Sequence, residues 1–308
     1  MHAPLRTRAV VLASALSLAL LSGCSDGDTA AEDPGPVDST TEPTASETVE
    51  PPSDSTTLTP SASPTPADQV TVPVYFVGET PQGPRLFREF RQVEADNPLE
   101  EAAALMTAGD ALDPDYGTLY PGGQFARVTF SEGAGAYVVE VADDGWNTRA
   151  DGMSRREAKL ATQQLVYTLQ GVGQSREPVL VQLGAEAVPL FGVDTSAGLT
   201  NAPQLDVLGF VNVSAPEEGT TVSGVITASG VASSFEATVP WEIRQDGEVV
   251  ERGFSNAEGW IDKLYPWETK VDLSGLEPGE YEFVALTDDP SGGEGAGPTE
   301  DSKTIFVE

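Results

Sequence analysis

The stretch that most limits how this chain can fold is residues 25–69, which contain no lysine or arginine and are rich in Ser, Thr, Pro, Asp and Glu. No apolar periodicity runs through it. A segment of this composition cannot bury enough apolar surface to offset the entropy lost on ordering. We therefore expect residues 24–69 to be a disordered tether with a root-mean-square reach of roughly 40 Å. Folded structure is expected to begin at Val70.

The residues before the tether have the features of a lipoprotein signal. Two arginines precede an apolar run at residues 9–21, which is shorter than the roughly 20 apolar residues of a spanning helix. The run ends in the sequence LSGC, which resembles the bacterial lipobox and contains the only cysteine of the chain, Cys24. We expect residues 1–23 to be a signal peptide and Cys24 to carry a lipid. That lipid is expected to anchor the protein on the extracytoplasmic face of the cell membrane.

The charge balance excludes several classes of partner. The chain has 16 basic and 49 acidic side chains and a formal net charge of −33 at pH 7. A field of this sign repels nucleic acid and anionic bilayers. We therefore expect no nucleic-acid partner, and we expect the membrane to be contacted through the lipid on Cys24.

The scarcity of imidazole and thiol groups excludes several kinds of chemistry. The single histidine, His2, lies in the expected signal peptide. Ser-His-Asp and Cys-His catalysis, and zinc sites built on His or Cys, are therefore excluded from the expected mature chain. The glycine-rich "GEGAG" near residue 293 is not followed by a helix pattern, so it does not indicate a nucleotide-binding loop. We expect no catalytic residues, no cofactor and no metal.

Residues 70–194 mix strand and helix patterns. "VTVPVYFVG" and "PRLFREFRQV" predict a hairpin, and a glycine-rich turn at 133–135 divides a second one. A helix is predicted from Asn97-Pro98 to Gly109. A longer helix is predicted to follow the S-x-x-E capping box at 154–157, and "PVLVQLG" to form a last strand. These patterns indicate an α+β domain.

The remainder of the chain has only strand patterns. After a linker at residues 195–208, residues 209–308 contain short alternating strands with turn residues every eight to twelve positions, including Asp246-Gly247. This spacing is typical of an immunoglobulin-like β-sandwich. The expected fold is therefore multidomain: a tether, an α+β domain and an all-β sandwich.

Both domains resemble known families. "VTVPVYFVG", "GTLYPGGQFARVTF" and "EAKLATQQLVYTLQGV" in residues 70–193 resemble the GerMN domain. "GFVNVSAPEEGTTVSGVITASGVASSFEATV", "DGEVV" and "PGEYEF" in residues 209–308 resemble the Gmad2 domain, an immunoglobulin-like partner of GerMN. The resemblance implies an envelope lipoprotein, with a weaker implication of sporulation or germination. It implies no cofactor and no established catalytic residues.

Basic residues are few, yet they cluster in the first domain. Either they are solvated charges paired with the excess of acids, or they form a docking face for an acidic partner. The candidate partner-binding residues of this kind are Arg85, Arg88, Arg149, Arg155 and Arg156, with Arg91, Lys159 and Arg176 nearby in the sequence.

Tryptophans cluster in the second domain. Trp241 lies in a strand pattern and is expected in the core, whereas Trp260 follows a glycine turn and is expected to be exposed. Trp260 and Trp267 are either core and strand-edge aromatics or a platform for sugar rings or a protein anchor.

The preferred hypothesis is a non-catalytic binding or assembly module whose partner is an envelope protein or peptidoglycan. The alternatives are a wall-glycan hydrolase using two carboxylates, or a wall-glycan-binding protein. Acidic stretches at 143–144 and 288–301 offer oxygen ligands for calcium, but neither has the spacing of an EF-hand, and an acidic turn accounts for each.

Overall fold

The computed structural model describes residues 68–289, 294–295 and 297–308. The expected signal peptide, Cys24 and nearly all of the expected tether lie outside the described residues. Among the helices that are described, none combines the length and the apolar character needed to cross a bilayer.

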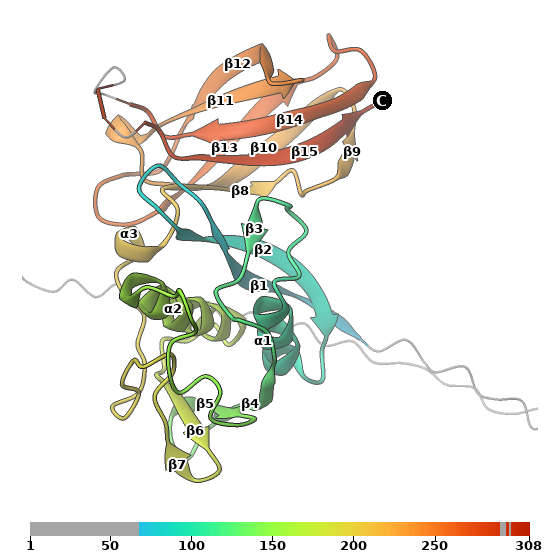
Figure 1. Ribbon diagram of the computed structural model, residues 1–308. Coiled ribbons are helices and arrows are strands. Elements are labelled where there is room, and N and C mark those ends of the chain that lie inside the picture. The colour runs from blue at the N-terminus through green and yellow to red at the C-terminus, as the bar shows by residue number, and fades with distance from the viewer. Residues whose placement is uncertain (1–67, 290–293, 296) are drawn as a thin grey trace, which may run out of the picture. The chain divides into compact units, whose positions relative to one another are not determined.

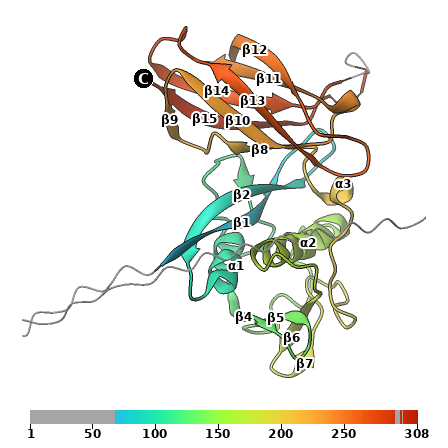
Figure 2. The ribbon, with the colours of Figure 1, turned by 180° about the vertical axis from the view of Figure 1, so that it is seen from behind.

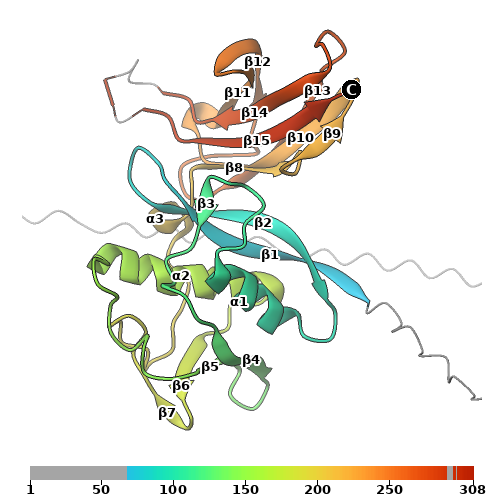
Figure 3. The same cartoon turned by 45° about the vertical axis from the view of Figure 1, so that its right-hand side comes forward.

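The α+β domain consists of two small sheets with two helices between them (Figure 1, Figure 3). The sheet orders are β2-β1-β3 and β4-β5-β6-β7. Its elements are β1 (Gln69–Gly78), β2 (Arg85–Glu94), α1 (Pro98–Ala108), β3 (Tyr116–Gly117), β4 (Phe125–Ser131), β5 (Ala136–Val141), α2 (Arg155–Val172), β6 (Val179–Leu183) and β7 (Glu186–Ala187).

Local sequence explains both helices. In α1, Asn97 stands at the cap position before Pro98, but its side chain makes no capping hydrogen bond. Gly109 ends that helix in the left-handed conformation, as predicted, with φ of 67°. The predicted capping box of α2 is formed: the Glu157 amide donates to Ser154 Oγ at 3.1 Å, and the Ser154 amide donates to Glu157 Oε2 at 2.7 Å. This box fixes the direction of the first turn of α2.

The second domain is a sandwich of two sheets, with orders β13-β10-β8 and β12-β11-β14-β15-β9 (Figure 2). Its elements are β8 (Val211–Ala215), β9 (Thr220–Val222), β10 (Val225–Ala232), β11 (Thr238–Gln245), β12 (Glu248–Asn256), β13 (Tyr265–Asp272), β14 (Gly279–Leu286) and β15 (Glu300–Val307), with a 3-10 turn at Phe235–Ala237. Asp246 and Gly247 both have positive φ, of 52° and 80°, in the predicted hairpin turn. The expected fold class, α+β followed by an immunoglobulin-like sandwich, is confirmed.

The two domains meet along the edge of β2. The Gly209 amide donates to Leu86 O at 2.9 Å, and the Arg88 amide donates to Asn212 Oδ1 at 3.3 Å. A short helix, α3 (Gln204–Val207), lies in the segment between the domains; one turn has no periodicity to reveal it in the sequence. Buried side chains from both sides form one small cluster across this contact: Leu86, Leu160, Tyr167, Leu208 and Leu264.

Candidate functional site

A buried ionic cluster joins the two domains. Lys303 on β15 donates from Nζ to Asp113 Oδ2 of the α+β domain, to Tyr116 Oη at 2.9 Å and to Asp301 Oδ1 at 3.1 Å. The second oxygen of Asp301 accepts from Asn212 Nδ2 at 2.9 Å and from the Val213 backbone amide at 2.6 Å. The three charged residues of the cluster are each at least 96% buried. We call Asp113, Tyr116, Asp301 and Lys303 the ionic cluster.

Burial and neighbouring charges set the protonation of this cluster. Burial raises the pKa of Asp113 to about 6, although the Lys303 ammonium acts in the opposite direction. Burial also raises the pKa of the Tyr116 hydroxyl well above its usual value, and the charges of Asp301 and Asp113 add to this. For Lys303, burial opposes the charge, but the two carboxylates outweigh it and raise its pKa. The ionic cluster therefore holds an ammonium, not a free amine that could act as a base.

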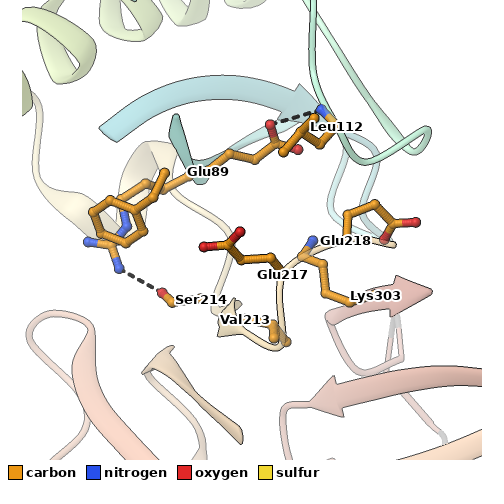
Figure 4. Close-up of a pocket in the computed structure, with 9 residues that line it drawn as sticks. Glu89, Leu112, Val213, Ser214, Glu217, Glu218 and Lys303 are labelled. Carbon is orange, nitrogen blue, oxygen red and sulfur yellow. Dashed lines mark hydrogen bonds between the residues drawn. The ribbon is translucent and has the colours of Figure 1, made fainter. Parts of the chain in front are cut away.

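Two of the three carboxylates that line a pocket beside the ionic cluster hold backbone amides (Figure 4). The Glu89 carboxylate accepts the amides of Leu112 and Asp113 at 3.0 and 2.8 Å. Glu218 Oε2 accepts the Thr304 amide at 2.8 Å. Both carboxylates thus hold backbone segments in place. The lining consists of Arg88, Glu89, Phe90, Leu112, Val213, Ser214, Glu217, Glu218 and Lys303.

A second hollow lies along the first turns of α2. It is built from two adjoining depressions that share Arg155, Lys159 and Val193. We call it the cationic groove; its basic lining is Arg149, Arg155, Arg156 and Lys159, its acidic lining is Asp194 and Asp206, and its apolar lining includes Leu160, Phe191, Val193, Leu199 and Val207. Basic residues therefore outnumber acidic ones here, in a chain with the opposite overall balance.

Two of the groove arginines are held by backbone carbonyls. Arg156 Nη2 donates to Gln82 O at 3.1 Å, and Arg149 Nη1 donates to Met153 O at 2.9 Å. Arg155 and Lys159 are exposed. The structure thus brings Arg149, named as a candidate from the sequence, to the same hollow as Arg155 and Arg156.

The strand arginines lie elsewhere and correct the sequence interpretation. Arg85 is 92% buried; its Nη1 donates to Leu205 O and Leu208 O, and its guanidinium lies 4.2 Å from the ring centre of Phe210. Arg88 Nη2 donates to Ser214 Oγ at 3.0 Å (Figure 4). Because both guanidinium groups are used between the domains, they do not form an external docking face.

The tryptophans divide between core and surface. Trp267 is 97% buried and stacks on Phe283 with ring centroids 6.5 Å apart, so it is a core aromatic, and the alternative that places it on a binding platform is wrong. Trp241 lies in the same core, as expected. Trp260 keeps 36% of its surface exposed and meets Phe235 edge-on at 5.2 Å.

Sequence reasoning missed the ionic cluster, although a signal was present. Every second residue of β15 is buried, at positions 301, 303, 305 and 307. Ile305 and Val307 mark this parity as the inward face, so Asp301 and Lys303 occupy inward positions. A buried acid and base on one strand face require partners, here supplied by Asp113 and Tyr116 of the other domain and by Asn212 of the same one.

Acidic residues form one group with metal-ligand spacing within the described part of the chain: Glu94, Asp96 and Glu101. Glu101 Oε2 already accepts the Glu94 amide at 2.8 Å, and Glu94 and Asp96 are exposed. Asp143 is used to cap the Gly145 amide at 2.8 Å. The 288–301 stretch lies partly outside the described residues. None of these features indicates a metal site.

Comparison with known proteins supports the assignment of the second domain. Residues 210–294 match the family model Gmad2, described as the immunoglobulin-like domain of bacterial spore germination. The second domain is a Gmad2 domain. The Gmad2 resemblance is thereby confirmed, and the α+β fold before it agrees with the GerMN resemblance of residues 70–193.

Solved structures are similar only at a low level. The tandem GerMN domains of the sporulation protein GerM from Bacillus subtilis are 11% identical, with a TM-score of 0.36; the alignment covers 67% of this chain and 62% of that one. A lytic polysaccharide monooxygenase from Jonesia denitrificans is 16% identical over 30% of this chain and 60% of that one, with a TM-score of 0.21. No curated protein matches the chain. These likenesses carry no argument about function.

Proposed function

We propose that this protein is a non-catalytic binding protein of the bacterial cell envelope that takes part in sporulation or germination. The Gmad2 match supports the biological setting. The LSGC sequence supports a lipid anchor on Cys24 and a position on the extracytoplasmic face of the membrane. The partner is an acidic protein segment that docks in the cationic groove.

The cationic groove is the observation that carries the binding role. Four of the chain's 16 basic side chains line it, and Arg155 and Lys159 are exposed there. Guanidinium groups bind carboxylates through paired hydrogen bonds, so an acidic ligand fits the walls. Leu160 and Leu199 add an apolar floor, which favours a segment that also has apolar side chains. A purely ionic polymer would leave that floor unused.

The state of the carboxylates supports a non-catalytic role. Glycoside hydrolysis needs one carboxylic acid and one carboxylate facing each other across the substrate. At the pocket of Figure 4, two of the three lining glutamates, Glu89 and Glu218, hold backbone amides. Asp113 and Asp301, in the neighbouring ionic cluster, are paired with Lys303. These acids have structural partners, and the hydrolase alternative gains no support from them.

In-cell photo-crosslinking tests the proposed function. A photo-reactive residue at Thr200, an exposed position in the groove lining, is introduced into the full chain. We expect it to capture an acidic envelope protein, identified by mass spectrometry. The double variant R155E/K159E should reduce capture at least tenfold, because it reverses two exposed charges of the groove.

The matched control is R252E/K270E, which makes the same charge change at exposed positions of the sandwich. Capture should survive this change. Capture that is insensitive to R155E/K159E, or equally reduced by both double variants, would contradict groove binding.

A further inference from the structure

Three large apolar side chains project from loops at one end of the sandwich. Phe235, Trp260 and Ile261 keep 39%, 36% and 66% of their surface exposed. The rings of Phe235 and Trp260 meet edge-on with centroids 5.2 Å apart. We call these three residues the apolar tip. Gathered apolar side chains on a protein surface mark interaction sites more often than single ones do.

The backbone holds the apolar tip in an unfavourable conformation. Ile261 has φ of 90°, and Glu236 and Ala237 have φ of 52° and 61°. Such values are costly for side chains with a Cβ, above all for a β-branched residue, and they cluster at functional positions. The Ile261 amide donates to Ser233 Oγ at 3.2 Å, which helps to hold the loop. The exposed isoleucine is therefore presented by a constrained loop.

Carboxylates flank the apolar tip. Glu236, Glu258 and Asp262 are exposed and lie next to the tip residues in the chain. Asp262 is held by Tyr265, whose hydroxyl donates to Oδ1 at 2.8 Å. One cation, Lys263, is adjacent, and its ammonium lies 4.8 Å from the Tyr265 ring centre. The surface that fits this tip is apolar at its centre and basic at its edge.

The cationic groove has that character, and it is a neighbour of the apolar tip. The Leu264 amide, three residues after Ile261, donates to Gln204 Oε1 of α3 at 2.9 Å. Asp206 and Val207, which end α3, line the groove. The short helix α3 thus contacts the segment that follows the tip and also forms part of the groove wall. A patch with an acidic apolar projection beside a basic apolar hollow is self-complementary under a twofold rotation.

We propose that two copies of this chain associate about a twofold axis, each placing its apolar tip in the other copy's cationic groove. The proposal rests on the proposed function, since it identifies the acidic apolar segment that the groove binds. Ile261 supplies the projecting apolar group, the groove floor receives it, and Glu258 and Asp262 face Arg155 and Lys159.

Cysteine crosslinking in cells tests this contact with the full chain. One copy has Lys263→Cys, at an exposed position beside the tip, and a differently tagged copy has Thr200→Cys; Cys24 is the only natural cysteine, and the unsubstituted chain controls for it. We expect a mixed dimer that contains both tags after mild oxidation. Absence of this mixed dimer overturns the proposal.

Charge reversal gives a second test of the contact. Restoration of the crosslink when two variants are combined shows that both are folded. R155E/K159E reverses the groove, and E258K/D262K reverses the tip. Each variant expressed alone with both cysteine positions should lose at least tenfold of the crosslink. Co-expression of the two variants should restore the crosslink. In the mixed dimer, the basic tip of E258K/D262K meets the acidic groove of R155E/K159E, and the natural tip of R155E/K159E meets the natural groove of E258K/D262K. Failure of the mixed pair to crosslink overturns the proposal.

The outcome also separates this proposal from the proposed function. If the Thr200 photo-crosslinker captures a second copy of the chain, both are supported. If it captures a different acidic protein in an R155E/K159E-sensitive manner and no mixed cysteine dimer forms, groove binding stands and the dimer is wrong.

Discussion

Lys303 shows, at the scale of single residues, how a very acidic chain uses one of its few cations. Its ammonium is 96% buried and is shared by Asp113 and Asp301. Removing such groups from water is costly, and their attraction offsets that cost only when the remaining hydrogen bonds are made. Tyr116 and Asn212 complete them here. The ionic cluster therefore requires both domains in place, and its protonation is linked to folding.

Asp113 gives this linkage a direction. Burial raises its pKa to about 6 in the folded protein, from a usual value of 3.8. The folded state therefore binds a proton at a higher pH than the unfolded state does. The stabilising contribution of Asp113 is greatest below pH 4 and is lost as the pH rises through 6. We expect the unfolding free energy of wild type minus that of Asp113→Asn to fall by about 2 kcal/mol between pH 4 and pH 7.

Chemical denaturation of both proteins across this pH range measures the difference. Asp144→Asn, at an exposed position, is the control and should show no such trend. A difference that is flat, or that grows with pH, would show that the Asp113 pKa is not raised in the folded protein.

At the scale of elements, α2 shows what local sequence predicts and what it leaves out. The capping box and the apolar spacing predict this helix, and its first turns contain three of the groove cations, Arg155, Arg156 and Lys159. The groove floor could not be predicted, because Val193 and Leu199 reach it from a loop some thirty or more positions later in the chain. Such contacts depend on tertiary packing, which has no local pattern.

Arg85 and Trp267 were misplaced for a related reason. Both residue types suit a binding surface, and the sequence left that alternative open for each of them, although strand parity favours the core for Trp267. On β13, Trp267 and Val271 share the inward face. On β2 the first three positions are all buried, and at this end Arg85 contacts Leu205 and Leu208 of the linker and Phe210 at the start of the Gmad2 domain. The parity of Trp267 was readable from sequence, whereas the burial of Arg85 depends on domain contact.

The capping box allows a prediction for α2. Ser154→Ala removes the acceptor for the Glu157 amide, so we expect a loss of about 1 kcal/mol in unfolding free energy and faster amide exchange in the first turn. Ser154→Asp provides another good cap and should retain most of the stability. Hydrogen exchange with mass spectrometry locates the effect. Unchanged exchange at residues 155–158 in Ser154→Ala would mean that the box does not stabilise this end of α2.

At the scale of the whole molecule, the contact between the domains decides whether they behave as one unit. The described residues belong to a single compact unit, and the contact combines β2, a small apolar cluster and the ionic cluster. Interfaces between domains of one chain are often polar and allow relative motion. Here a buried charge network limits that motion, because separation would take Asp113 and Tyr116 away from Lys303 and leave the Asp113 carboxylate without its cation.

Lys303→Met tests this coupling. The variant keeps most of the side-chain volume and leaves Asp113 and Asp301 buried without their cation, which typically costs about 3–5 kcal/mol. Lys270→Met removes an exposed lysine from the same domain and should change stability by about 0.5 kcal/mol or less.

In calorimetry we expect wild type and Lys270→Met to unfold in one transition. Lys303→Met should split that transition in two, one for each domain. In hydrogen exchange, the amides of the α+β domain and those of the Gmad2 domain should then exchange independently. Two transitions in wild type, or one unshifted transition in Lys303→Met, would show that the ionic cluster does not couple the domains.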